Sequence, residues 1–145
     1  MNLKGTATVP RPRDEAFERM LDPEVLKRCI PGCESLRAVT EDLYDVVVRA
    51  GIGPVKGNFE GSVTLSGIDA PCGYRMEVEG KGTVGFVEGS ADVSLEPGED
   101  EDWTVVRYDG VAKVSGVIAS VGGRLVEAAA RKLAREFFER MAAQE

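Results

Sequence analysis

The spacing of apolar residues changes along this chain, and that change restricts the fold more than any other feature. From Leu43 to Val114 apolar side chains recur at every second position, whereas from about Val117 to Ala143 they recur at every third or fourth. A period of two is typical of a strand with one face toward water, and the longer period is typical of an amphipathic helix. The apolar face of such a sheet must be covered, and the final helix is the only large apolar partner in the sequence.

The residues before these strands add one more strand and two short helices. Leu3 to Val9 alternate and predict a half-buried strand, and a short helix with one apolar face follows Pro12. A second helix begins at Asp22-Pro23 and ends before Pro31-Gly32, because proline is tolerated just inside a helix start but not in its interior. No linker or repeat interrupts the 145 residues. The sequence therefore predicts one α+β domain over residues 1–145, with a curved antiparallel sheet of about seven strands.

The net charge of −7 is concentrated in one segment. Glu96 to Asp102 carries five carboxylates and no basic residue, which predicts a solvated turn. An acidic chain without a basic stripe is repelled by phosphate backbones, so we expect no nucleic-acid binding. The sequence shows no secretory signal and no stretch near the ~20 apolar residues of a membrane span, and its odd number of cysteines, three, suggests reduced thiols. We therefore expect a cytoplasmic protein.

The residue types that most catalytic and metal sites need are missing or badly placed. The sequence contains no histidine, which removes histidine-activated nucleophiles and the commonest nitrogen ligand of metals. Cys29, Cys33 and Cys72 are one ligand short of a structural zinc site, so we interpret them as packing residues, with a redox pair of Cys29 and Cys33 as the alternative. Gly80 to Gly85 matches G-x-G-x-x-G, but a strand follows it, which predicts a hairpin turn. The inward strand positions hold no pair of carboxylates, so we predict no catalytic residue, no metal, no cofactor and no enzyme activity.

Small residues gather where the sheet should meet the final helix. That helix should begin within SGVIASVGG, residues 115–123, which is small and apolar throughout. Small side chains on both surfaces allow either close packing of the helix on the sheet or an internal cavity, and the residues alone leave both open. The small inward positions of the sheet are Gly57, Gly61, Gly85, Gly89, Ala91, Gly110 and Ala112.

Four segments resemble a known family. They are DPEVLKRCIPGC at Asp22–Cys33, GPVKGNFEG at Gly53–Gly61, GKGTVGFVEGSADVSL at Gly80–Leu95 and VGGRLVEAAARKLAREFF at Val121–Phe138. In this order they resemble the carbon monoxide dehydrogenase G-subunit (CoxG) family, within the START and birch-pollen-allergen (SRPBCC) superfamily. The resemblance implies a helix-grip fold, in which the curved sheet wraps around the long C-terminal helix, and it favours a cavity over close packing.

The predicted cavity is lined by apolar residues and tyrosines at inward positions. The hydroxyls of Tyr44, Tyr74 and Tyr108 are suited to hydrogen-bond a ligand carbonyl, with backbone or water as the alternative partners. Three Gly-rich segments, GIGPV, GKGTVG and SGVIASVGG, should form a rim through which an apolar ligand enters, with core packing as the alternative role of the rim side chains. The wall residues are Phe17, Met20, Ile30, Tyr44, Val46, Val48, Phe59, Tyr74, Met76, Val106, Tyr108, Val121 and Leu125, and the rim residues are Ile52, Val55, Val84, Val117 and Ile118.

The resemblance also implies a role. Members of the family are associated with molybdenum hydroxylases of the carbon monoxide dehydrogenase type. The chain is therefore expected to bind or carry a hydrophobic small molecule, a quinone or a lipid, for a molybdenum-containing dehydrogenase, with transient contact at the inner membrane face. Two alternatives stay open: an assembly or maturation factor that acts on that dehydrogenase by protein contact, and a cyclase- or aromatase-like enzyme of the same fold.

Overall fold

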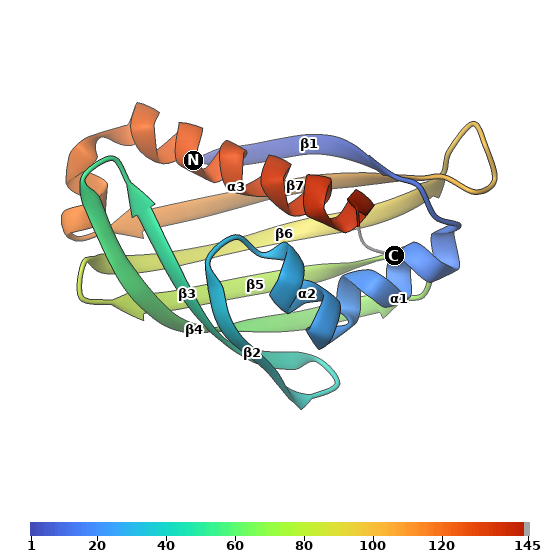
Figure 1. The fold of residues 1–145 in the computed structure, drawn as a ribbon, viewed down its shortest axis with the longest axis horizontal. Helices are drawn as coiled ribbons and strands as arrows, with labels where there is room; N and C mark the ends of the chain where they lie inside the picture. The colour runs from blue at the N-terminus through green and yellow to red at the C-terminus, as the bar shows by residue number, and fades with distance from the viewer. Residues whose placement is uncertain (144–145) are drawn as a thin grey trace.

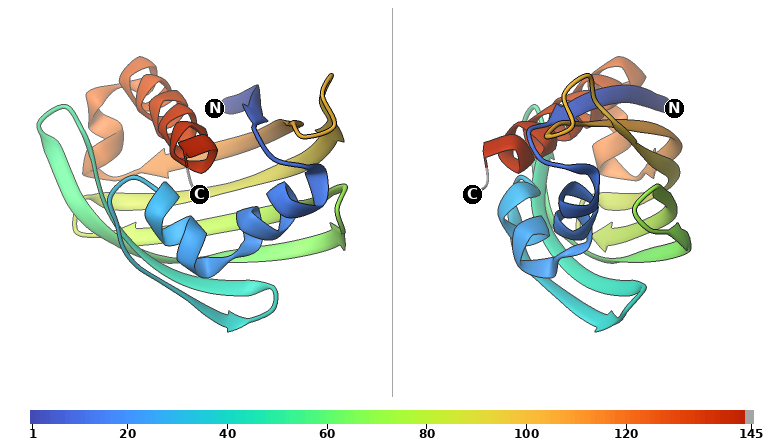
Figure 2. Two further views of the ribbon diagram at one scale, coloured as in Figure 1. Left: turned by 45° about the vertical axis from the view of Figure 1, so that its right-hand side comes forward. Right: turned by 90° about the vertical axis from the view of Figure 1, so that its right-hand side faces the viewer.

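The chain folds into one curved antiparallel sheet with its helices on the concave side (Figures 1 and 2). The structure, a computed structural model, describes residues 1–143. The elements in order are β1 (Asn2–Val9), α1 (Arg13–Leu21), α2 (Pro23–Cys29), β2 (Cys33–Thr40), β3 (Leu43–Ile52), β4 (Val55–Asp69), β5 (Gly73–Gly82), β6 (Gly85–Pro97), β7 (Thr104–Ser115), the 3₁₀ helix η1 (Val117–Val121) and α3 (Gly123–Ala143).

The sheet is a meander of six strands, and the first strand of the chain extends it at one edge. The strand order is β1-β7-β6-β5-β4-β3-β2, so β2 to β7 follow one another and β1 pairs with β7 at the far edge. Figure 2 shows the strands bending around α3. The predicted fold class, a seven-stranded curved antiparallel sheet with two short helices after the first strand and a long C-terminal helix, is confirmed.

Local interactions determine where α2 begins and where β5 turns into β6, as the sequence predicts. Asp22 caps α2, because its Oδ1 accepts a hydrogen bond from the backbone N–H of Glu24 at 2.9 Å, and Pro23 occupies the first turn. Thr83 and Val84 join β5 to β6, so the G-x-G-x-x-G segment is a hairpin turn; Gly85 has a φ of 148°, which favours glycine. The acidic segment joins β6 to β7 and is mostly exposed, as predicted.

The start of the final helix differs from the prediction of one helix from about Val117. Residues Val117–Val121 form η1, and Gly122, with a φ of 100°, separates η1 from α3. A 3₁₀ helix has 3.0 residues per turn, so the residues of α3 point in other directions than in one continuous α-helix from Val117. Leu125, predicted to face the cavity by its spacing from Val121, is 54% exposed, whereas Val126 is 7% exposed. Val126 therefore takes the inward position that was predicted for Leu125.

The closely packed core lies at one end of the sheet, beneath α1 and α2. Its members, from both short helices, three strands and the end of α3, are Val9, Ala16, Phe17, Met20, Val25, Cys29, Val93, Leu95, Val106 and Met141. No described helix contains a stretch that is both long and apolar enough to cross a bilayer. The candidate site lies toward the other end of the concave face, outside this cluster.

Candidate functional site: an apolar groove beneath α3

Small residues form the floor of the concave face beneath α3. The register of β6 and β7 pairs Gly89 with Ala112 and Ala91 with Gly110, so these four positions form one block on the inner face. All four are only half-buried. The atoms nearest to a Cβ placed on Gly89 or Gly110 belong to neighbouring strands. Gly89 and Ala112 also line a hollow on the convex face of the sheet, so part of their exposure lies on that side.

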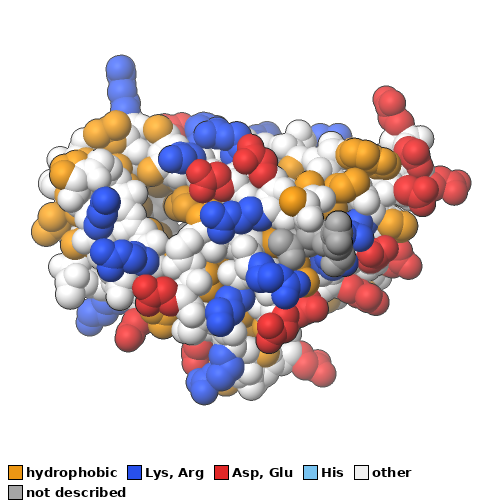
Figure 3. Space-filling model, viewed as in Figure 1, with side chains coloured by type: hydrophobic (Ala, Val, Ile, Leu, Met, Phe, Trp, Pro, Cys, Tyr) orange, Lys and Arg blue, Asp and Glu red, His pale blue; other side chains and the backbone are white. Residues whose placement is uncertain are grey.

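Leu133 is an exposed apolar residue on the face of α3 that also carries Val126 and Phe137. It lies seven residues after Val126 and four before Phe137, so at about 100° per residue it shares their face of α3. Val126 is buried and Phe137 packs against the core, yet Leu133 between them is 41% exposed. Figure 3 shows the surface hollowed between α3 and β3, with hydrophobic atoms at the edge of the hollow. We call the space between Leu133 and the small-residue floor the α3 groove.

The predicted wall residues divide into two groups. Phe17, Met20 and Val106 belong to the closely packed core, so their role in this structure is packing. Tyr44 and Phe59 are also buried, at 4% and 8% exposure. The half-buried residues are those that retain surface for a ligand: Ile30, Val46, Val48, Tyr74, Met76, Tyr108 and Val121.

The three predicted rim segments come together at the open end. The backbone N–H of Ile118 in η1 donates to the carbonyl of Val84 at 2.7 Å, and η1 also contacts β3 and β4. Ile52, Val55 and Val84 are half-buried, and Val117 is 57% exposed. Ile118 differs from its predicted rim role, because it is 4% exposed and packs against Gly85, where a Cβ would lie 2.9 Å from its Cγ2. At Ile118 the alternative role, packing in the core, applies.

The three tyrosines of the concave face have different surroundings. The hydroxyl of Tyr44 donates to the backbone carbonyl of Leu21 at 2.6 Å. The ring of Tyr108 stacks on Phe138 with centroids 5.7 Å apart. The ring of Tyr74 meets Phe17 edge-on at 6.0 Å. Burial raises the pKa of the Tyr44 and Tyr74 hydroxyls, and the effect on Tyr74 is the larger.

Metal-ligating and thiol groups were two further candidates for a site in residues 1–143. No three His, Cys, Asp or Glu side chains within residues 1–143 converge on a metal position. The cysteines are free, and burial raises the pKa of Cys29 and Cys33, so both thiols stay protonated and weakly reactive at neutral pH. Cys29 is a packing residue of the core, as predicted, and Cys33 is half-buried. Cys72 is exposed, so its interpretation as a packing residue is wrong.

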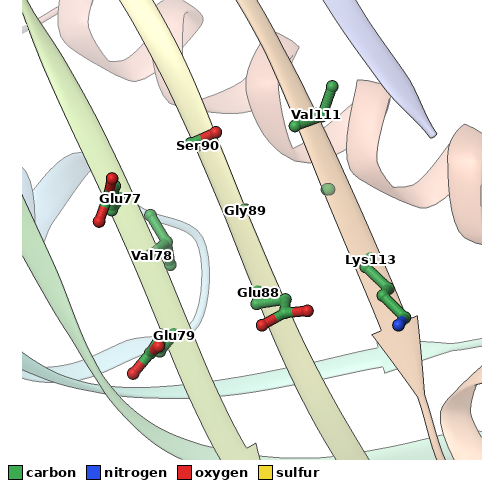
Figure 4. A pocket seen from close by; sticks show the side chains of 9 residues that line it. Glu77, Val78, Glu79, Glu88, Gly89, Ser90, Val111 and Lys113 are labelled. Atoms are coloured by element: carbon green, nitrogen blue, oxygen red, sulfur yellow. The ribbon is translucent and has the colours of Figure 1, made fainter.

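A second hollow, of about 350 Å³, lies on the convex face of the sheet. Figure 4 shows that Glu77, Glu79, Glu88 and Lys113 surround it, with α3 behind the sheet. It is open, and Val78, Gly89, Val111 and Ala112 line it together with these charged side chains. The charged groups around it are exposed to water, so we do not assign the apolar ligand to this hollow.

Two residues of the groove were missing from the predicted site. Val126 and Leu133 are seven positions apart on one face of α3, and Leu133 carries the largest exposed apolar side chain on that face. The seven-residue spacing was visible in the sequence. The phase of the helix was not, because it depends on the break at Gly122.

Comparison with known proteins gives one family and one fold. The sequence profile of the carbon monoxide dehydrogenase G-subunit (CoxG) family matches residues 5–144. A conserved protein from Geobacillus kaustophilus is similar in structure, with a TM-score of 0.92, 30% identity and coverage of 99% of this chain and 93% of that one. No curated protein sequence matches the chain.

Two more distant structures are similar in fold alone. A START superfamily protein from Mycobacterium smegmatis has a TM-score of 0.72 at 13% identity, with 98% of this chain and 94% of that chain covered. The Zhui aromatase/cyclase from Streptomyces sp. R1128 has a TM-score of 0.66 at 13% identity, with 99% and 92% covered.

Proposed function

The chain belongs to the CoxG family of carbon monoxide dehydrogenase proteins, and from that premise we propose that it binds and carries a hydrophobic small molecule, a quinone or a lipid, in the α3 groove. Its partner in this proposal is a molybdenum-containing dehydrogenase of the carbon monoxide dehydrogenase type. The protein works in the cytoplasm and contacts the inner membrane face transiently, with the exposed Val117 beside the open end of the groove.

The observation that carries the proposal is the exposure of Leu133 on the inward face of α3. A leucine flanked by Val126 and Phe137 on one helix face is normally buried against the sheet, yet Leu133 is 41% exposed. An apolar ligand in this space removes the side chain and the floor from water. Each buried methylene contributes about 0.8 kcal/mol, so the length of an apolar chain sets much of the affinity.

The residues lining the groove favour binding over catalysis. A cyclase or aromatase reaction needs groups that move protons at the bound substrate. The inward positions beside the groove are apolar, small or tyrosine, and the acidic residues of β5 and β6 take the alternate, outward positions. Similarity to an aromatase/cyclase at 13% identity supports a shared fold and carries no activity to this chain.

Mass spectrometry of an organic extract tests the proposal directly. The wild-type protein is purified without detergent from cells that make isoprenoid quinones, together with Leu133→Trp and Ala128→Trp. Leu133→Trp fills the groove, whereas Ala128 is exposed about 200° around the helix from Val126 and serves as the control. We expect near-stoichiometric quinone or lipid from wild type and from Ala128→Trp, and at least tenfold less from Leu133→Trp.

A wild-type extract without quinone or lipid, repeated after incubation with quinone-bearing vesicles, contradicts the carrier role. That result favours the alternative of an assembly or maturation factor. Equal amounts of ligand in wild type and Leu133→Trp contradict the position of the site rather than the role.

A further inference from the structure

One end of the molecule carries basic side chains and no acidic ones. It is formed by the β3–β4 turn, the β5–β6 turn, η1 and the first turn of α3, which lie together in Figures 1 and 2. The contacts agree, because η1 packs against β3, β4 and β6. Residues 49–57, 81–87 and 115–126 contain no Asp or Glu, and their basic residues are Arg49, Lys56, Lys81 and Arg124. We call this surface the basic end.

Three of these cations have no carboxylate partner. Neither Arg49, Lys56 nor Arg124 forms an ion pair with another residue among 1–143. The cross-strand neighbours of Arg49 and Lys56 are uncharged. Glu127, one turn after Arg124 in α3, is itself paired with Arg131 at 2.7 Å. All three side chains are exposed, so their positive charge faces solvent without compensation.

The charge of the protein is separated along its long axis. The acidic segment, residues 96–102, joins β6 to β7 at the opposite end, and Figure 3 shows Asp and Glu side chains gathered there. A uniformly charged surface on a protein of net charge −7 would be repelled by any anionic partner. The separation instead allows an anionic partner to attract the basic end while it repels the acidic end.

Exposed apolar side chains accompany the cations at the basic end. Val117 is 57% exposed and Leu125 is 54% exposed. Ile52 and Val55 of the β3–β4 turn are half-buried. Such side chains are stabilised where lipid headgroups meet acyl chains, and basic residues beside them reach the headgroup phosphates. A dissolved phosphate or a nucleic acid would use the cations alone, so the combination favours a lipid surface.

We propose that the basic end is a docking surface for a bilayer that contains anionic phospholipid, with Arg49, Lys56 and Arg124 at the headgroup phosphates and Val117 and Leu125 in the interface. This inference rests on the proposed function, and it adds the class of lipid and the orientation of the protein. In this orientation the open end of the α3 groove faces the bilayer, and the acidic segment faces away from it.

Removal of the three unpaired cations tests the electrostatic part. The basic-end variant is Arg49→Gln/Lys56→Gln/Arg124→Gln; Lys81 is kept because Glu60 lies opposite it. Flotation measures binding to quinone-free vesicles of phosphatidylcholine, with and without about 30% phosphatidylglycerol. We expect wild type to bind only the anionic vesicles, and less as salt is added. Each basic residue near such a surface strengthens binding about fivefold, so the variant should bind at least tenfold more weakly.

A control variant separates position from net charge. Lys27→Gln/Arg135→Gln/Arg140→Gln also removes three exposed cations, but from α2 and the second half of α3. Arg135 lies about 17 Å along the helix from Arg124. Both variants have the same net charge, and we expect the control to lose less than about threefold in binding to the anionic vesicles.

The single tryptophan provides an independent test of the orientation. Trp103 is 43% exposed and directly follows the acidic segment. Vesicles with brominated acyl chains quench the fluorescence of a tryptophan that enters the bilayer. We expect bound wild type to show no quenching, because Trp103 faces away, and bound Val117→Trp/Trp103→Phe to be quenched.

Four outcomes overturn the docking surface. Equal losses in the basic-end and control variants would reduce the effect to net charge, and quenching of Trp103 would place the acidic end on the bilayer. Equal binding of wild type to both kinds of vesicle would remove the role of anionic lipid. Absence of vesicle binding would leave an acidic protein surface as the partner of the basic end. If the organic extract still contains quinone or lipid, the carrier role survives each of these results. An empty extract with charge-dependent vesicle binding overturns the carrier role and supports the docking surface.

Discussion

At the scale of single residues, Tyr74 couples the stability of the protein to alkaline pH. In the unfolded chain a tyrosine ionises near pH 10, whereas burial raises the pKa of folded Tyr74 above that. Between these two values the folded state retains a proton that the unfolded state has lost, so the free energy of unfolding falls as pH rises. The slope for one such group is at most about 1.4 kcal/mol per pH unit.

Urea unfolding of wild type and Tyr74→Phe between pH 8 and pH 11 measures this effect. The two proteins should have parallel stability below about pH 9, and wild type should lose more stability above pH 10. Tyr44, whose pKa is also raised by burial, remains in the variant and retains part of the alkaline loss. Identical slopes in the two proteins would show that the Tyr74 hydroxyl is not buried in solution.

Two pairs of neighbouring residues show where prediction from sequence fails at this scale. Val117 is 57% exposed and Ile118 is 4% exposed; Leu125 is 54% exposed and Val126 is 7% exposed. In each pair both side chains are apolar, so hydrophobicity alone does not tell which one points inward. The direction depends on the 3₁₀ turn and on the positive φ of Gly122, which the composition of SGVIASVGG permits but does not require.

At the scale of elements, the cap of α2 has a measurable effect on stability. Asp22 accepts a hydrogen bond from the backbone N–H of Glu24, satisfying one of the free donors at the helix start. Asp22→Ala should lower the free energy of unfolding by about 1 kcal/mol, within the usual range of ~0.5–2 for a lost cap, whereas Asp22→Asn retains an acceptor and most of the stability. Chemical denaturation measures both. A loss as large in Asp22→Asn as in Asp22→Ala would show that the charge, rather than the cap, matters.

The strands and the short helices could be predicted from the sequence because each is determined locally. Apolar or small residues alternate with polar ones from Val55 to Leu65, so only one face of β4 is apolar. The observed register pairs this face with the inward residues of β3 and β5. Pro31-Gly32 likewise ends α2 where expected. The wrap of the sheet around α3 involves residues far apart in sequence, and it was expected from the family resemblance rather than from periodicity.

At the scale of the whole molecule, the groove depends on how far α3 stands from the sheet. The helix packs against β1 and α2, and Gly89, Ala91, Gly110 and Ala112 form a block of small residues on the inner face of the sheet. Small residues on the floor are compatible both with a helix in close contact and with an open groove. The sequence alone therefore does not distinguish a tight interface from a groove. The exposure of Leu133 favours the groove, which is why the proposed function rests on it.

Leu133→Trp also tests this separation without any ligand. In a tightly packed interface the larger side chain would overpack the core and cost about 1–3 kcal/mol. In an open groove it covers apolar floor that water now reaches, so we expect the free energy of unfolding to stay within about 0.5 kcal/mol of wild type or to rise. Denaturant unfolding of ligand-free protein measures the difference, with Ala128→Trp as the control on the exposed face.

The same variant links the groove to ligand binding through the stability of the whole domain. A ligand at one hundred times its dissociation constant stabilises the folded state by about 2.7 kcal/mol, which for a domain of this size raises Tm by roughly 5–10 °C. We expect decyl-benzoquinone to produce this rise in wild type and Ala128→Trp but not in Leu133→Trp. A rise of equal size in Leu133→Trp would place the ligand elsewhere. A large loss of stability in ligand-free Leu133→Trp would mean that α3 closes on the sheet in solution, so that a ligand must lift the helix in order to bind.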